Sequence, residues 1–85
     1  MVSGTEFLAQ LEAETTKIVG RIVASCVIQS QLKRNHFAAE TCSPADCKKV
    51  VDCTVEAIGL FATKYETRKL QLELEELYRT SFPSS

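Results

Sequence analysis

Glycine and proline are scarce in this chain of 85 residues, which holds three glycines and two prolines. Because these two residue types mark most turns, their scarcity argues against a β fold with many turns and favours long helices. Hydrophobic residues make up 45% and charged residues 25% of the sequence, proportions that are typical of a folded domain and not of a disordered chain. The sequence therefore predicts a single all-α domain over residues 1–85.

The chain also lacks an excess of charge of either sign. Its formal net charge is −1 and its pI is about 5.8, whereas nucleic-acid binding depends on clustered lysines and arginines. Lys33, Arg34 and His36 form one small basic group. They are explained by a position near a helix C-terminus, where the helix dipole favours cations. We therefore expect no nucleic-acid partner.

Long hydrophobic runs and targeting signals are missing as well. The longest apolar-rich run, residues 22–28, is far shorter than the roughly 20 residues that a membrane-spanning helix needs. The N-terminal residues show neither the basic nor the apolar region of a secretory signal, and no myristoylation or prenylation motif is present. These absences predict a chain without a membrane span, located in the cytoplasm or the nucleus.

The sequence contains no recognisable motif of an enzyme or a metal site. It has no Gly-rich phosphate loop, dinucleotide fingerprint or calcium loop. Its four cysteines include no C-x-x-C pair, which zinc ribbons and thioredoxins require. A zinc site would have to combine His36, Cys42, Cys47 and Cys53, but Cys47 and Cys53 point to different sides of one predicted helix. We expect no enzymatic activity, metal ion or cofactor.

The cysteines support an alternative function, a redox- or metal-responsive helical switch in which Cys26, Cys42 and Cys53 are the redox residues. In an antiparallel hairpin with its turn near residues 39–40, Cys26 and Cys53 lie level, which would allow a disulfide. However, Cys53 lies about 120° from the apolar seam of its helix. Cys42 precedes a predicted helix N-terminus, a place that lowers the pKa of a thiol. The other interpretation makes Cys26 and Cys47 small buried hydrophobic residues.

The clearest positive signal is a helix start at residues 43–46. Ser43 can cap the helix, Pro44 suits its first position, and Asp46 can complete a capping box. This start divides the chain into two predicted helices, about 4–34 and 44–80, joined by a turn at about 35–43. In the turn, Asn35 can take the left-handed conformation of a helix end, and Phe37 is expected to cover the end of the hairpin.

The first predicted helix carries apolar residues over about half of its circumference. Residues 17–28 are rich in β-branched side chains and contain Gly20, so a strand is the alternative there. Spacing by three and four residues favours a helix, because a half-buried strand would alternate strictly. The main apolar row is Leu8, Leu11, Ile18, Ile22, Cys26 and Leu32, and the second row is Val19, Val23 and Val27.

The second predicted helix carries an apolar face that changes direction part-way along. From Cys47 to Tyr65 the apolar residues step by three and four, as in a coiled-coil seam, with Thr54 among them. The next apolar set, formed by Leu70, Leu74 and Leu77, lies roughly 100–180° further around the helix. Two interpretations stay open: one long helix whose apolar face changes sides near residues 66–69, or a third, short helix after a bend there.

A hairpin of two helices cannot bury all of these faces, because each helix offers the other only one contact face. Several exposed leucines would form a sticky patch. We therefore predict that the antiparallel hairpin completes a four-helix bundle as a homodimer or within a larger assembly, with a monomeric three-helix bundle as the alternative. The predicted contact residues are Leu70, Leu74, Leu77, Tyr78 and Phe82.

The predicted function is accordingly a non-enzymatic protein–protein interaction module. It would be a small helical scaffold or adaptor subunit whose partner is a second copy of the chain or another helical protein. A membrane-surface binder would need a basic face opposite an apolar one. Acidic and basic residues are mixed on both predicted helices, which disfavours that function.

Overall fold

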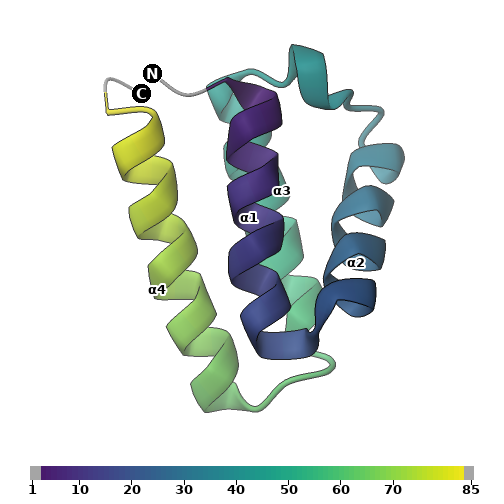
Figure 1. The fold of residues 1–85 in the computed structure, drawn as a ribbon, viewed down its shortest axis with the longest axis vertical. Coiled ribbons are helices and arrows are strands. Elements are labelled where there is room, and N and C mark those ends of the chain that lie inside the picture. The colour runs from purple at the N-terminus through teal and green to yellow at the C-terminus, as the bar shows by residue number, and fades with distance from the viewer. Residues whose placement is uncertain (1–2, 84–85) are drawn as a thin grey trace.

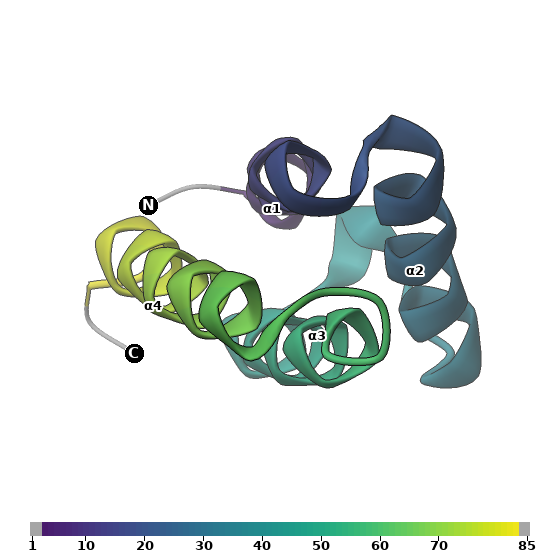
Figure 2. The same ribbon diagram turned by 90° about the horizontal axis from the view of Figure 1, so that it is seen from below.

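The computed structural model describes residues 3–83, which form an all-α fold as predicted (Figure 1). Helix α1 spans Gly4–Val19, α2 spans Arg21–Arg34, α3 spans Pro44–Ile58 and α4 spans Lys64–Ser81, and a short 3₁₀ turn, Ala39–Thr41, lies between α2 and α3. Helix α1 packs against α2, α3 and α4. Figure 2 shows α2 and α4 on opposite sides of the α1–α3 pair.

Serine side chains cap the starts of α1 and α3. The backbone N–H of Glu6 donates to Ser3 Oγ at 3.2 Å at the start of α1. At the start of α3, the backbone N–H of Asp46 donates to Ser43 Oγ at 3.2 Å, and the backbone N–H of Ser43 donates to Asp46 Oδ2 at 3.3 Å. The capping box at Ser43 is therefore confirmed, with Pro44 in the first turn.

The predicted helix over residues 4–34 is interrupted at Gly20, and the strand alternative is wrong because both sides are helical. Gly20 has φ 88° and ψ 162°, a conformation that is essentially restricted to glycine. Its N–H donates to the Thr16 carbonyl at 2.9 Å, and its carbonyl accepts from the Ala24 N–H at 3.0 Å. Gly20 therefore ends α1 and starts α2 while keeping its own backbone groups paired.

The predicted helix over residues 44–80 is also interrupted, but not at residues 66–69. Helix α3 ends at Ile58, and α4 begins at Lys64 with a second capping box. The backbone N–H of Thr63 donates to Glu66 Oε1 at 3.1 Å, and the backbone N–H of Glu66 donates to Thr63 Oγ1 at 3.1 Å. The change of apolar face thus reflects a new helix with its own direction.

Helix α2 ends in a Schellman motif. The N–H of Phe37 donates to the Leu32 carbonyl at 2.9 Å, and the N–H of His36 donates to the Lys33 carbonyl at 3.2 Å. The left-handed residue is His36, with φ 59°, and not Asn35 as expected. Phe37 is half-buried against the core, as predicted for a residue that covers this end.

The hydrophobic core takes residues from all four helices. Helix α1 contributes Phe7 and Leu11, α2 contributes Ile28, and α3 and α4 contribute a further set that includes Val50, Val51, Ile58, Leu70 and Leu74. At the end of the bundle that holds both termini, the Phe7 ring lies 6.0 Å from the Tyr78 ring and 5.3 Å from the Phe82 ring, measured between centroids. One chain therefore supplies the four helices that a dimer was expected to supply, and the physical reason for expecting that dimer disappears.

Two threonines are fully buried in this core and differ in their hydrogen bonding. Thr15 Oγ1 donates to the Leu11 carbonyl at 2.8 Å. Thr54 Oγ1 has no hydrogen-bond partner among the described residues. A buried hydroxyl without a partner carries a desolvation penalty of roughly 1–3 kcal/mol.

Substitution of Gly20 tests its role as the break between α1 and α2. Open space surrounds the position, but an alanine would be strained at φ 88°. We expect Gly20→Ala to lower the free energy of unfolding by about 1–3 kcal/mol in urea titrations. Gly59→Ala is the matched control, because Gly59 has φ −57°, and it should stay within about 1 kcal/mol of the wild type. Equal effects of the two substitutions would contradict this role.

Thr54→Val should stabilise the fold by about 1 kcal/mol, because valine fills the same space without the unpaired hydroxyl. Thr15→Val is the matched control, and it should lower the free energy of unfolding by roughly 0.5–1.5 kcal/mol because it removes a hydrogen bond. Urea unfolding of the two variants beside the wild type measures the difference. If Thr54→Val lowered the free energy of unfolding as much as Thr15→Val does, the Thr54 hydroxyl would not be destabilising.

Candidate interaction surfaces

The structure corrects the predicted set of contact residues. Leu70 and Leu74 are fully buried and Phe82 is almost fully buried, because α4 packs against α1 and α3 within the same chain. These three residues present no surface to a partner. Leu77 and Tyr78 are half-buried at the edge of the core, so of the five predicted residues they alone remain accessible.

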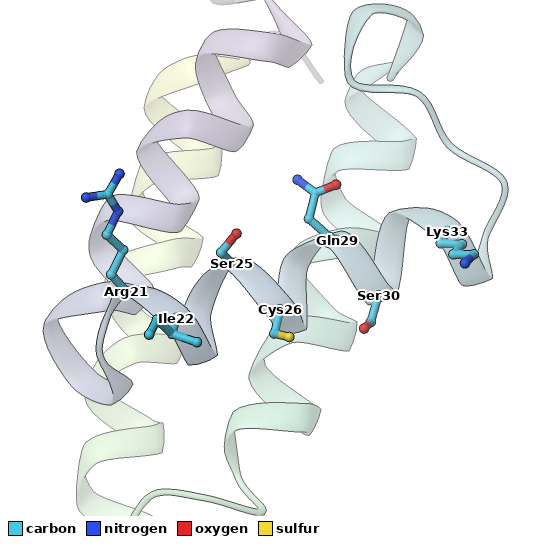
Figure 3. Close-up of a pocket in the computed structure, with 7 residues that line it drawn as sticks. All are labelled: Arg21, Ile22, Ser25, Cys26, Gln29, Ser30 and Lys33. Atoms are coloured by element: carbon cyan, nitrogen blue, oxygen red, sulfur yellow. The ribbon is translucent and has the colours of Figure 1, made fainter.

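Cys26 and Cys53, predicted to lie level across a hairpin, face different surroundings. Cys26 is exposed on the outer side of α2 (Figure 3), where it is not the buried hydrophobic residue of the alternative interpretation. Cys53 lies on α3 and borders a groove with Gln31 and Arg34 of α2. All four cysteines are free thiols.

The thiols at the start of α3 are not activated. Burial, and secondly the negative charge of Asp46, raise the pKa of Cys42, against a smaller lowering by a hydrogen bond with Cys47. Burial, and then Cys42 and Asp46, raise the pKa of Cys47 to about 11. The expected lowering of the Cys42 pKa is therefore wrong in direction. The main physical reason is the burial of the Cys42 thiol. The Asp46 carboxylate, which completes the capping box, raises the pKa further because its negative charge opposes the positive end of the helix dipole.

Metal ligands do not gather in the part of the chain that the structure describes. Among residues 3–83, no three side chains of His, Cys, Asp or Glu lie close enough together to hold a metal ion. Over the same residues, no helix is both long and apolar enough to cross a membrane.

Large exposed apolar side chains concentrate at one end of the bundle. The end in question is formed by the α1–α2 link and the α3–α4 loop, opposite the termini (Figures 1 and 2). We call it the loop end. Four large apolar residues there are mostly exposed: Ile22 (83%), Leu60 (83%), Phe61 (66%) and Tyr65 (79%).

Four exposed basic residues accompany these side chains. They are Arg21 at the start of α2 and Lys64, Arg68 and Lys69 in the first turns of α4. None of the four belongs to an ion pair among residues 3–83, where the paired cations are Lys17, Lys48 and Arg79. The Glu66 carboxylate, in the same part of α4, accepts the N-cap hydrogen bond from Thr63.

A shallow groove runs between α1 and α4, and Leu72, which is 54% exposed, lies in it. We call it the α1–α4 groove. Leu77 lines it as well, and three acidic residues stand around these leucines: Glu14 on α1, and Glu73 and Glu76 on α4. Lys17 pairs with Glu14 at 3.1 Å, and Arg79 pairs with Glu76. Glu73 belongs to no ion pair among the described residues.

The outer side of α2 forms a hollow that is not a binding site. Its lining residues are Arg21, Ile22, Ser25, Cys26, Gln29, Ser30 and Lys33, and all of them belong to α2 (Figure 3). A ligand pocket encloses most of its ligand, whereas this hollow has a wall on one side only. No described residue thus forms a small-molecule site there.

Thiol alkylation tests the assignment of the cysteines. With iodoacetamide and peptide mapping, we expect Cys26 to react fastest because it is exposed, and Cys47 to stay unmodified until the pH approaches 11. The raised pKa means that the folded state favours the neutral Cys47 thiol more than the unfolded state does. This contribution to stability is therefore present below pH 9.0, the ordinary pKa, and is lost as the pH rises to about 11. In urea all four should react alike. Labelling of Cys42 at neutral pH as fast as Cys26 would contradict the raised pKa.

Comparisons with known proteins give no further guide. No protein family matches the chain, and no curated protein or solved structure is significantly similar to it. The function is therefore inferred from the surfaces described above.

Proposed function

We propose that this chain is a non-enzymatic protein–protein interaction module, a small helical adaptor subunit whose protein partner docks in the α1–α4 groove. The observation that carries the proposal is the exposure of Leu72 in a groove lined by two helices. Leu72 is not part of the hydrophobic core, so folding does not explain why a large apolar residue stands at this exposed position. Apolar floors with a polar rim are the usual anatomy of protein interfaces.

The partner that fits this groove is an amphipathic helix that carries lysine or arginine beside its apolar stripe. Helices commonly dock into grooves through apolar residues spaced by three and four. Glu14 and Glu76 are paired with Lys17 and Arg79, so Glu73 leaves one unpaired negative charge at the rim, and a basic residue of a partner would be complementary to it. A second copy docked groove to groove would bring these acids together, which favours a different protein over a homodimer.

The alternative function, a cysteine-based switch, receives less support. A redox sensor needs a thiol with a low pKa and access to solvent. The pKa values of Cys42 and Cys47 are raised, and the exposed Cys26 has no second thiol on its surface of α2. The interaction module is therefore the function we retain.

Leu72→Ser tests the proposal, with Leu60→Ser as the matched control on the other surface. Both residues are mostly exposed, so both variants should fold like the wild type. We expect cross-linking and quantitative mass spectrometry in the source cells to show protein partners lost from Leu72→Ser and kept by Leu60→Ser. On a purified partner, the loss of the covered leucine surface corresponds to about 1 kcal/mol, or roughly fivefold weaker binding.

One outcome would change the identity of the partner, and another would overturn the proposal. If light scattering shows a wild-type dimer that Leu72→Ser converts to a monomer, the partner is a second copy, and the preference for a different protein is wrong. If Leu72→Ser keeps every partner that the wild type has, the α1–α4 groove is not a docking surface and the proposal fails.

A further inference from the structure

The loop end combines exposed apolar side chains with exposed basic residues. It carries four large exposed apolar side chains, from Ile22 on α2 to Tyr65 on α4. It also carries exposed basic residues without ion pairs, Lys64, Arg68 and Lys69 on α4, and Arg21 begins α2 at this end with its side chain directed away from the α3–α4 loop (Figure 3). The α1–α2 link and the α3–α4 loop bring them to the same end although they lie about 40 residues apart in the chain (Figures 1 and 2).

Few acidic groups offset these cations. Glu66 is held by the capping box of α4, and Glu14 pairs with Lys17 in the last turns of α1. Glu73, one helical turn after Lys69, and Glu56, exposed in the last turns of α3, are the nearest acids in sequence that neither a cap nor an ion pair engages among the described residues. The loop end is therefore basic even though the whole chain has a formal net charge of −1.

We propose that the loop end docks on an anionic phospholipid surface. Its apolar side chains would enter the interface between headgroups and acyl chains, and its cations would contact the phosphate groups. Phenylalanine and leucine beside lysine and arginine are the usual composition of such interfacial sites. Each lysine or arginine near an anionic membrane strengthens binding by roughly fivefold.

A membrane explains these residues better than a protein partner does. Protein interfaces are depleted in lysine, which supplies two of the four basic residues here, but they are enriched in arginine, phenylalanine and tyrosine, which are also present. The surface also consists of a loop, a link and helix ends, so it meets a planar surface without needing a partner of matching shape. A second copy is disfavoured because two basic ends would repel each other.

This inference does not depend on the α1–α4 groove. The groove residues of α4 lie from its middle onward, at Leu72 to Thr80, whereas the loop end begins before α4 and includes only its first turns. A chain standing on a membrane by its loop end would leave the groove open. The two surfaces together describe an adaptor that links a protein to a membrane.

Vesicle co-sedimentation tests the inference with defined lipids. The probes are vesicles of phosphatidylcholine alone and vesicles in which phosphatidylserine makes up roughly a third of the lipid. The wild-type chain should bind the anionic vesicles, bind the neutral ones at least tenfold more weakly, and lose affinity as salt is raised. Binding to neither kind of vesicle at low salt would overturn the inference.

Two pairs of variants separate the apolar and the basic contributions. Phe61→Ser/Tyr65→Ser should reduce binding to anionic vesicles at least tenfold, with Leu72→Ser unchanged as its control. Lys64→Gln/Lys69→Gln should reduce it roughly 25-fold. Its control is Lys33→Gln/Lys49→Gln, which removes two exposed lysines in the last turn of α2 and near the start of α3, at the other end of the bundle.

The substituted side chains are exposed, so thermal unfolding should be alike in all variants. Equal loss of binding in test and control pairs would show non-specific adsorption and overturn the inference. The inference would also be overturned if the wild-type chain bound no vesicles and Phe61→Ser/Tyr65→Ser lost a protein partner that the wild type binds. Neither result would touch the proposed function, which is tested through Leu72.

Discussion

The positive φ of Gly20 is the constraint on which the rest of this structure depends. Without a break at that point, α1 and α2 would be one long helix with a half-cylinder of apolar surface and a single neighbour. Because Gly20 keeps its hydrogen bonds to Thr16 and Ala24 on either side, the chain changes direction without leaving the backbone groups of Gly20 itself unpaired. Helix α2 then lies against α3, and most of the two predicted apolar rows gains a neighbour within the chain, whereas Ile22 and Cys26 of the main row stay exposed.

The second break works by a different physical means, a capping box and not a special φ. Thr63 and Glu66 exchange hydrogen bonds that fix the start of α4, and Gly59, before it, has an ordinary helical φ. The new direction of α4 carries Leu70 and Leu74 into the core that α1 and α3 share. In one continuous helix, Leu70 and Leu74 would point away from the core. In the separate helix α4, the same chain buries them.

Local signals predicted some of this fold, and non-local ones were beyond the sequence pattern. The cap at Ser43 and the covering role of Phe37 could be predicted, because each depends on neighbours within a few residues. Gly20 is a visible signal, but the helical spacing on both sides of it masks the break. Thr63 and Glu66 have the spacing of a capping box, but the apolar spacing that continues to Tyr65 favours an uninterrupted helix there. The raised Cys42 pKa required knowing that burial and the Asp46 charge outweigh the helix dipole, and the basic loop end required knowing which distant turns meet.

Exposed and buried apolar residues therefore have different roles in this chain, and the sequence alone does not distinguish them. Leu74 and Leu60 are the same residue type, but Leu74 is fully buried and Leu60 is 83% exposed. The free energy of folding depends on Leu74, and loss of Leu60 would change it little, because little of its surface leaves water on folding. An exposed leucine among unpaired cations thus contributes little to the stability of the fold. Burial of this leucine against another surface would still be favourable. Since the α1–α2 link and the α3–α4 loop lie about 40 residues apart in the chain, this arrangement emerges only when the chain is folded.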